Sequence, residues 1–143
     1  MKCRIFISDN HEEEVLIYTH KRTELTDAIE QLVAEHGIEL VGYNDREGVK
    51  INLSDVYLFT VEGGKVYAVT ENERLYLRCR LYSLEETLPD NFVKINQSCI
   101  ANIRKIRRFD TSITGTLLIK FSNGMSDYVS RRQLKNVKER LGL

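Results

Sequence analysis

Two short polar clusters toward the carboxyl end carry the side chains best suited to chemistry. The first, FVKINQSCIAN at residues 92–102, places lysine, asparagine, glutamine and serine between strand-like apolar residues. The second, YVSRRQ at residues 128–133, places two arginines directly after a serine. Amide and cationic side chains offer hydrogen-bond donors that suit phosphates and base edges. We therefore expect a surface for an anionic polymer rather than a catalytic pocket.

The first cluster has side chains that match the edges of nucleic-acid bases. Asn96 and Gln97 can each make bidentate hydrogen bonds to adenine, and Lys94 can bond to guanine. The alternative is an ordinary loop, because asparagine and serine favour turns for local backbone reasons. Lys65, which follows the Gly63-Gly64 pair at a hairpin tip, is a third candidate. It would either touch a phosphate or simply be solvated.

The second cluster is predicted to begin the final helix. Ser130 and Gln133 have the spacing of a capping box, so Arg131 and Arg132 would occupy the first two helical positions. Cations there oppose the helix macrodipole by about 0.3–1 kcal/mol each. Free backbone amides also point outward at this end, so the turn would suit a phosphate. The alternative is an exposed charged turn whose charges are paired elsewhere, for instance with Asp127.

Composition limits the class of protein. The chain has 143 residues, 42% of them apolar, and a single proline, which is typical of one globular domain with or without an appendage. No apolar stretch approaches the roughly 18 residues of a membrane span, and no signal peptide is visible, so we expect a cytoplasmic protein. The three cysteines have no CxxC spacing, which favours neither a disulfide framework nor a zinc site.

The net charge of zero conceals a strong asymmetry along the chain. Residues 1–43 carry four Lys and Arg against nine Asp and Glu, whereas residues 101–143 carry ten against three. Such polarity predicts an acidic part and a basic part with different partners. A basic surface attracts nucleic acid or anionic lipid, although a merely solvated face is the alternative.

Hydrophobic periodicity divides the chain into two parts. The first part, residues 1–43, is predicted to be a small α/β extension with a β-β-α-β order, and the turn-rich residues 44–48 end it. Its elements are expected at residues 2–8, 15–18, 23–36 and 38–43. The second part, residues 44–143, is predicted to hold about eight to ten short strands. Its two small helices are expected at residues 83–88 and from residue 130. The expected class is α+β, mainly β and antiparallel.

Sequence patterns for enzymatic chemistry are missing. There is no P-loop, GxSxG, HExxH or Rossmann glycine pattern. All three histidines lie in polar surroundings in the acidic first part, without metal-ligand spacing. We expect no catalytic residue, no cofactor and no metal site, and no small-molecule substrate is evident.

Several segments in a fixed order resemble the LytTR DNA-binding domain over about residues 44–143. The segments are LSDVYLF at 53–59, KVY at 65–67, LYSLE at 81–85 with Leu88-Pro89, FVKINQS at 92–98 with Asn102, and VSRR at 129–132. The resemblance implies a mostly antiparallel β domain without a helix-turn-helix. It also implies that loops enter the grooves of promoter DNA.

The resemblance assigns roles to particular residues. Asn96 and Gln97 would contact bases or backbone, in place of the histidine and arginine of many family members, so a different DNA sequence is implied. Arg131 and Arg132 would face DNA, and Lys65 would approach the backbone. Ser98 and Asn102 would brace the loop, and Ser130 would support the last turn. Further cations would attract phosphates: Lys94, Arg104, Lys105, Arg107, Arg108 and Lys135.

The implied function is that of a stand-alone bacterial LytTR transcriptional regulator without a receiver domain, acting as a homodimer on promoter repeats. The first 43 residues would be a regulatory or dimerisation element, and a small membrane protein is an implied regulator. One alternative is a protein-interaction or signal-sensing module of the same fold that has lost DNA binding. Another is single-stranded RNA binding through Tyr67, Tyr76 or Tyr82, although these aromatics also suit a core or sheet pairs.

Overall fold

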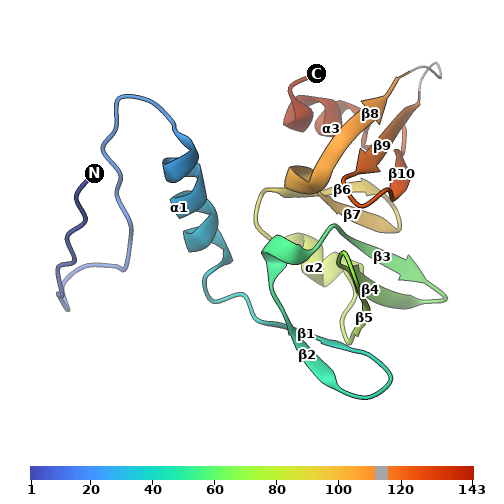
Figure 1. Ribbon diagram of the computed structural model, residues 1–143, viewed down its shortest axis with the longest axis horizontal. Coiled ribbons are helices and arrows are strands. Elements are labelled where there is room, and N and C mark those ends of the chain that lie inside the picture. The colour runs from blue at the N-terminus through green and yellow to red at the C-terminus, as the bar shows by residue number, and fades with distance from the viewer. Residues whose placement is uncertain (112–115) are drawn as a thin grey trace. The chain divides into compact units, whose positions relative to one another are not determined.

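The computed structural model describes residues 1–111 and 116–143. Contacts divide the chain into two units, Met1–His36 and Gly37–Leu143 (Figure 1). The sequence placed the division after residue 43 instead. The difference arises because strand β1, Leu40–Tyr43, pairs with strands of the second unit and not with the acidic segment before it.

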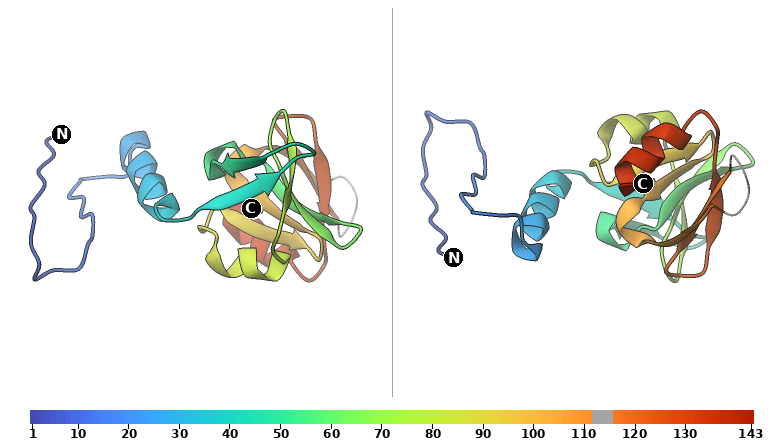
Figure 2. Two further views of the ribbon diagram at one scale, coloured as in Figure 1. Left: turned by 90° about the horizontal axis from the view of Figure 1, so that it is seen from below. Right: turned by 90° about the horizontal axis from the view of Figure 1, so that it is seen from above.

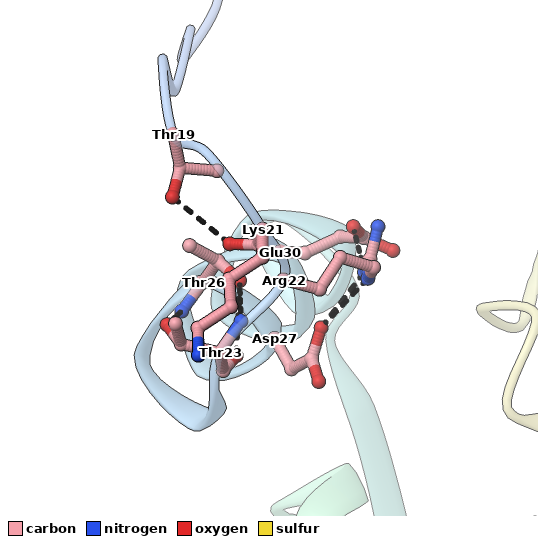
Figure 3. A network of polar contacts seen from close by, with 7 residues as sticks. All are labelled: Thr19, Lys21, Arg22, Thr23, Thr26, Asp27 and Glu30. Atoms are coloured by element: carbon pink, nitrogen blue, oxygen red, sulfur yellow. Dashed lines mark hydrogen bonds and ion pairs between the residues drawn. The ribbon is translucent and has the colours of Figure 1, made fainter.

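The first unit contains one helix, α1, Glu24–Glu35, as the periodicity predicted. Thr23 and Thr26 bond reciprocally at its start, which satisfies amides that the helix leaves free. Arg22 lies beside this turn and bridges two helix carboxylates, those of Asp27 and Glu30, as Figure 3 shows. These local contacts define the helix start, but only Thr26 of the unit is buried.

The two strands predicted at residues 2–8 and 15–18 are not formed, so that part of the prediction was wrong. The alternating pattern is present, but a strand is stable only against a partner with compatible side chains. Within the first unit these residues are exposed throughout.

The second unit is built on a seven-stranded antiparallel sheet in the order β2-β1-β5-β4-β3-β7-β6. Besides β1, its strands are β2 Gly48–Ile51, β3 Leu58–Glu62, β4 Lys65–Val69, β5 Arg74–Leu77, β6 Phe92–Asn96 and β7 Cys99–Asn102. The Gly63-Gly64 pair joins β3 to β4 with positive φ at both residues, the tight hairpin that the sequence predicted.

A second, three-stranded antiparallel sheet has the order β10-β9-β8. Its strands are β8 Ile106–Asp110, β9 Leu117–Phe121 and β10 Ser126–Val129. Two helices, α2 Leu81–Thr87 and α3 Leu134–Leu141, and two 3₁₀ turns, η1 Leu53–Asp55 and η2 Ile103–Lys105, complete the described elements. The α+β, mainly β prediction is confirmed.

Both helices of the second unit begin at positions that differ from the predicted ones. Helix α2 starts at Leu81 rather than Ser83, and no side chain caps it. Helix α3 starts at Leu134, so Gln133 is the N-cap residue itself and makes no side-chain cap bond. The predicted capping box at Ser130 is therefore wrong. Packing of apolar residues, rather than a local cap, sets both starts.

Strand β3 shows how the core is organised. Leu58 belongs to a buried cluster that includes residues of β9, β10 and α3, whereas its neighbour Phe59 belongs to a second cluster that includes residues of α2. Successive side chains of a strand point to opposite faces. The large sheet is therefore covered on both faces around β3, β6 and β7, and in Figure 2 helix α2, in yellow-green, lies apart from the orange and red strands of the small sheet.

Candidate nucleic-acid interface

Three turns far apart in sequence adjoin strands that hydrogen bonds connect. They are the β3–β4 tip at residues 63–65, the β6–β7 turn at 97–98 and the β10–α3 turn at 130–133, together called the three turns below. The Val61 amide of β3, two residues before the first turn, donates to the Ser98 carbonyl of the second turn at 2.9 Å. The Ser130 amide donates to the Ile95 carbonyl at 2.8 Å, which links the third turn to β6.

Asn96 links the second turn to the end of β10, just before the third turn. Its Nδ2 donates to the Tyr128 carbonyl at 2.9 Å, and its Oδ1 accepts from the Ser98 amide at 2.9 Å. The short amide side chain thus closes its own turn and holds the end of β10, two bonds that need both a donor and an acceptor. Asn96 is half-buried, while Gln97 and Ser98 next to it are exposed.

The β10–α3 turn presents the two predicted arginines to solvent. Arg131 and Arg132 are exposed, and neither makes an ion pair with another residue that the structure describes. They lie before α3 rather than at its first two positions, so the predicted placement on the helix was wrong. The helix macrodipole therefore does not oppose cations at Arg131 and Arg132. Their solvent exposure leaves both side chains available to an anion. Lys135 is exposed on the first turn of α3.

The two predicted lysines outside α3 differ in their surroundings. Lys65 is exposed at the β3–β4 tip, with its Nζ 5.6 Å from the ring centroid of Tyr76. Lys94 is half-buried on β6, and its Nζ lies 3.6 Å from Glu85 Oε2 of α2. Lys65 therefore lies on the first of the three turns, whereas Lys94 makes an ion pair with Glu85 of α2.

Asn102 is the most buried polar side chain among the predicted residues, with 2% of its surface exposed. Its Nδ2 donates to the Val56 carbonyl at 2.8 Å, and its Oδ1 accepts from Asn91 Nδ2 at 3.0 Å and from the Arg104 amide at 3.1 Å. These bonds connect β7, the start of η2 and the segment before β3. Asn102 can hold strands in place but cannot reach a ligand in this position.

The small sheet adds cations that sequence reasoning identified only in part. Arg108 on β8 is paired in register with Lys120 on β9, and both are exposed. Lys120 was missed, although the alternation of buried Ile119 and Phe121 around it is a signal for an outward position. The other exposed cations of this region are Arg104 and Arg107, and Lys105 lies 5.1 Å from the Tyr57 ring centroid.

The tyrosines of the RNA alternative are already engaged. Tyr67 and Tyr76 are opposite each other on β4 and β5, with ring centroids 6.1 Å apart. The Arg74 guanidinium lies 4.7 Å from the Tyr67 centroid. These half-buried rings form a cross-strand pair, with Arg74 over Tyr67 and Lys65 over Tyr76. Such a sheet pair was the alternative to RNA binding that the sequence left open. Tyr82 is exposed on α2.

The cysteines have separate environments and form no disulfide in the described parts of the chain. Cys99 is fully buried on β7, and burial, together with the neighbouring Asp127 carboxylate, raises the pKa of its thiol well above the ordinary range. Burial also raises the pKa of Cys79. No group of His, Cys, Asp and Glu among residues 1–111 and 116–143 has the arrangement of a metal site.

Comparison with known proteins identifies the class of domain. The LytTr DNA-binding domain family matches residues 46–142. A solved structure, the LytTr DNA-binding domain of a putative methyl-accepting/DNA response regulator from Bacillus cereus, has the same fold with a TM-score of 0.70. It is 22% identical, and the match covers 73% of this chain and 97% of that chain.

Similar curated proteins extend over the whole length. An uncharacterised HTH-type transcriptional regulator of Staphylococcus aureus strain NCTC 8325 is 36% identical over 148 residues, covering 100% of this chain and 99% of the relative. Another, from the bovine strain RF122/ET3-1, is 35% identical with the same coverage. The chain belongs to the LytTR DNA-binding domain family, a family of DNA-binding domains and not of enzymes.

The names of these relatives contain a motif that the described residues lack. A helix-turn-helix needs two helices joined by a short turn. In the second unit α2 and α3 are separated by the five strands β6 to β10. Within the described residues, no helix has the length and apolar character to cross a membrane.

Proposed function

We propose that this protein is a bacterial transcriptional regulator that binds double-stranded promoter DNA sequence-specifically, with the three turns inserted into the grooves. The observation that carries the proposal is the set of hydrogen bonds that connects the strands and turns of this region, with Gln97, Arg131 and Arg132 exposed on the turns. Membership of a DNA-binding family supports it. The protein would act in the cytoplasm as a homodimer on repeated half-sites.

The exposed side chains divide into readers and phosphate contacts. Gln97 has the donor and acceptor needed for an adenine edge, and Arg132 has the paired donors that match guanine. Arg131, Lys65 and Lys135 would neutralise phosphates, which releases counterions and supplies much of the affinity. The outward cations of the small sheet would extend this attraction along the duplex.

Three of the predicted residues are proposed to position the interface rather than touch DNA. Asn96 uses its amide to close the β6–β7 turn and to hold the end of β10, and Asn102 is buried under the strands. The Ser130 backbone holds the start of the third turn against β6. Lys94, paired with Glu85, would contribute only general attraction.

The first test is Arg132→Ala in a fluorescence anisotropy titration with a DNA site selected on the purified protein. We expect binding to weaken by about 1–3 kcal/mol if Arg132 reads a guanine, with relaxed preference at that base pair. Lys138→Ala is the matched control, because Lys138 is also exposed but lies in the last turn of α3. Unchanged affinity for Arg132→Ala would remove this residue from the interface.

A protein-interaction module of LytTR fold that has lost DNA binding is the second candidate. The exposed apolar side chains of the first unit favour it, because such residues are normally covered by a partner. Salt dependence separates the two functions. DNA binding through phosphates weakens steeply from low to moderate salt. A flat response, or equal affinity for every anionic polymer, would support the interaction module.

A further inference from the structure

The first unit exposes more apolar surface than an independent segment can tolerate. Ile5, Phe6 and Ile7 are 85%, 84% and 97% exposed, and Leu32 on α1 is 71% exposed. A 12-residue helix is marginal in water without tertiary packing, and an isolated extended segment has no means of burying its apolar residues. The unit therefore requires a covering partner, and its own sequence indicates which one.

A local hairpin would pair the two extended segments of the first unit poorly. A turn lies at Asp9 and Asn10, where the Asn10 amide donates to Ser8 Oγ at 3.2 Å. A hairpin closed by this turn would set Ile5 opposite Glu14, Ile7 opposite Glu12 and Arg4 opposite Val15. Each of these pairs places a charge against an apolar side chain, which gives a poor cross-strand contact. This mismatch explains why residues 2–18 form no strand within one chain.

A different register matches the same two segments at five of their seven positions; Cys3 with Glu13 and Ser8 with Tyr18 are the two that do not match. In a parallel arrangement with an offset of ten residues, charges meet opposite charges and apolar residues meet apolar residues. The pairs are Lys2 with Glu12, Arg4 with Glu14, Ile5 with Val15, Phe6 with Leu16, and Ile7 with Ile17. Opposite charges and apolar pairs on neighbouring strands are the contacts that stabilise a sheet.

The parallel register cannot form inside one chain. Parallel neighbours need a crossover of about a dozen residues or more, and only residues 9–11 connect the two segments. A second copy removes this restriction, because its segments are not tied by that connection. The match is also reciprocal, since each copy carries both the basic segment and the acidic one, as a two-fold interface requires.

We propose that residues 2–18 of two copies pair by strand exchange, the basic first segment of each beside the acidic second segment of the other. The apolar stripe of α1, which includes Leu25, Leu32 and Val33, covers the sheet so formed. This inference deepens the homodimer part of the proposed function. It does not depend on DNA, so the two can fail separately.

Charge reversal in the full chain tests the pairing. Variant one, Lys2→Glu with Arg4→Glu, makes both segments acidic, and variant two, Glu12→Lys with Glu14→Lys, makes both basic. All four side chains are exposed in the single chain, so the fold of the second unit is not perturbed. By sedimentation velocity we expect a wild-type dimer, a monomer for each variant alone, and a heterodimer when the two variants are mixed.

Recovery on mixing is the decisive result, because only pairing between chains restores both sets of opposite charges. A control with Arg46→Glu and Glu86→Lys, exposed in the second unit, should remain a dimer. A monomeric wild type throughout the micromolar range would overturn the inference and favour another partner for the first unit, such as a membrane protein. So would a dimer that survives in either variant, or variants that stay monomeric when mixed.

The same samples separate this inference from DNA binding. Anisotropy with a single half-site reports the three turns alone, whereas a duplex with two half-sites also reports dimerisation. If the variants bind a single half-site as the wild type does but no longer bind the two-half-site duplex more tightly, both proposals stand. If the wild type is monomeric and still binds one half-site, the pairing is wrong and the proposed function stands. If the wild type is a dimer that binds no duplex, the pairing stands and the proposed function is wrong.

Discussion

Replacing Asn96 with alanine should loosen two parts of the proposed interface at once, the β6–β7 turn and the end of β10. The substitution removes the bond from Asn96 Nδ2 to the Tyr128 carbonyl and the bond from the Ser98 amide to Asn96 Oδ1, both 2.9 Å long. The first fixes the end of β10 against β6, and the second closes the β6–β7 turn.

The size of the effect follows from the number and exposure of the bonds. A hydrogen bond contributes about 0.5–1.5 kcal/mol net, so two of them set a range of about 1–3 kcal/mol. Asn96 is half-buried and Tyr128 is 49% exposed, so water can replace part of what is lost. We expect the free energy of unfolding to fall by about 1–2 kcal/mol, at the lower end of the range for two net bonds.

Two measurements on Asn96→Ala separate a positioning role from a base contact. Urea denaturation followed by circular dichroism should show the loss of stability. Anisotropy titrations should show weaker binding to the selected DNA site and to an unrelated duplex by a similar factor, because displaced turns weaken every contact. Gln97→Ala is the matched control: its side chain is exposed on the same turn, so stability should not change while preference for the selected site falls.

The opposite pattern would refute this reasoning. If Asn96→Ala keeps the stability of the wild type and loses affinity only for the selected site, Asn96 reads a base directly. The hydrogen bonds to Tyr128 and Ser98 would then have to break when DNA binds.

Three other substitutions test the framework that holds the interface. Asn102→Leu should lower the free energy of unfolding by about 2–4 kcal/mol, because three hydrogen bonds are lost and buried partners remain unpaired; a loss under about 1 kcal/mol in urea denaturation would contradict this. The raised pKa of Cys99 keeps its thiol protonated in the fold while the unfolded chain ionises, so stability should fall by about 1.4 kcal/mol per pH unit above about pH 9, relative to Cys99→Ala. Parallel slopes for the two proteins would show that Cys99 is not the cause. Gly42→Ala should cost about 1–3 kcal/mol in the same assay, because its Cβ would lie 2.5 Å from Leu75 Cβ, whereas Gly48→Ala, with its nearest contact at 3.3 Å, should cost less.

Local signals in the sequence predicted the elements that depend on few residues. The Asn123-Gly124 dipeptide marks the β9–β10 hairpin, where Gly124 has a φ of 88° that a residue with a Cβ rarely adopts. The apolar periodicity of α1 and the glycine after it likewise predicted that helix. In each case the information lies within one turn of the chain, so spacing alone is sufficient.

Contacts between distant segments explain what the sequence did not predict. The bond from Asn96 to Tyr128 spans 32 residues, which no local pattern reveals, so the sequence predicted a base contact for Asn96 but not this structural bond. The start of α3 was misplaced because Ser130 uses its amide to reach Ile95 and so ends the strand region rather than capping the helix. The N-terminal strands were overpredicted because alternation shows the preference of a segment but not whether a compatible neighbour exists.

The arrangement of the three turns separates binding from stability at the level of individual residues. Side chains on the turns, such as Gln97 and Arg132, are exposed, so we expect their replacement to change DNA binding with little effect on folding. The bonds beneath them, from Val61 to Ser98 and from Ser130 to Ile95, belong to the pairing of strands distant in sequence. The interface therefore exists only when both sheets have assembled.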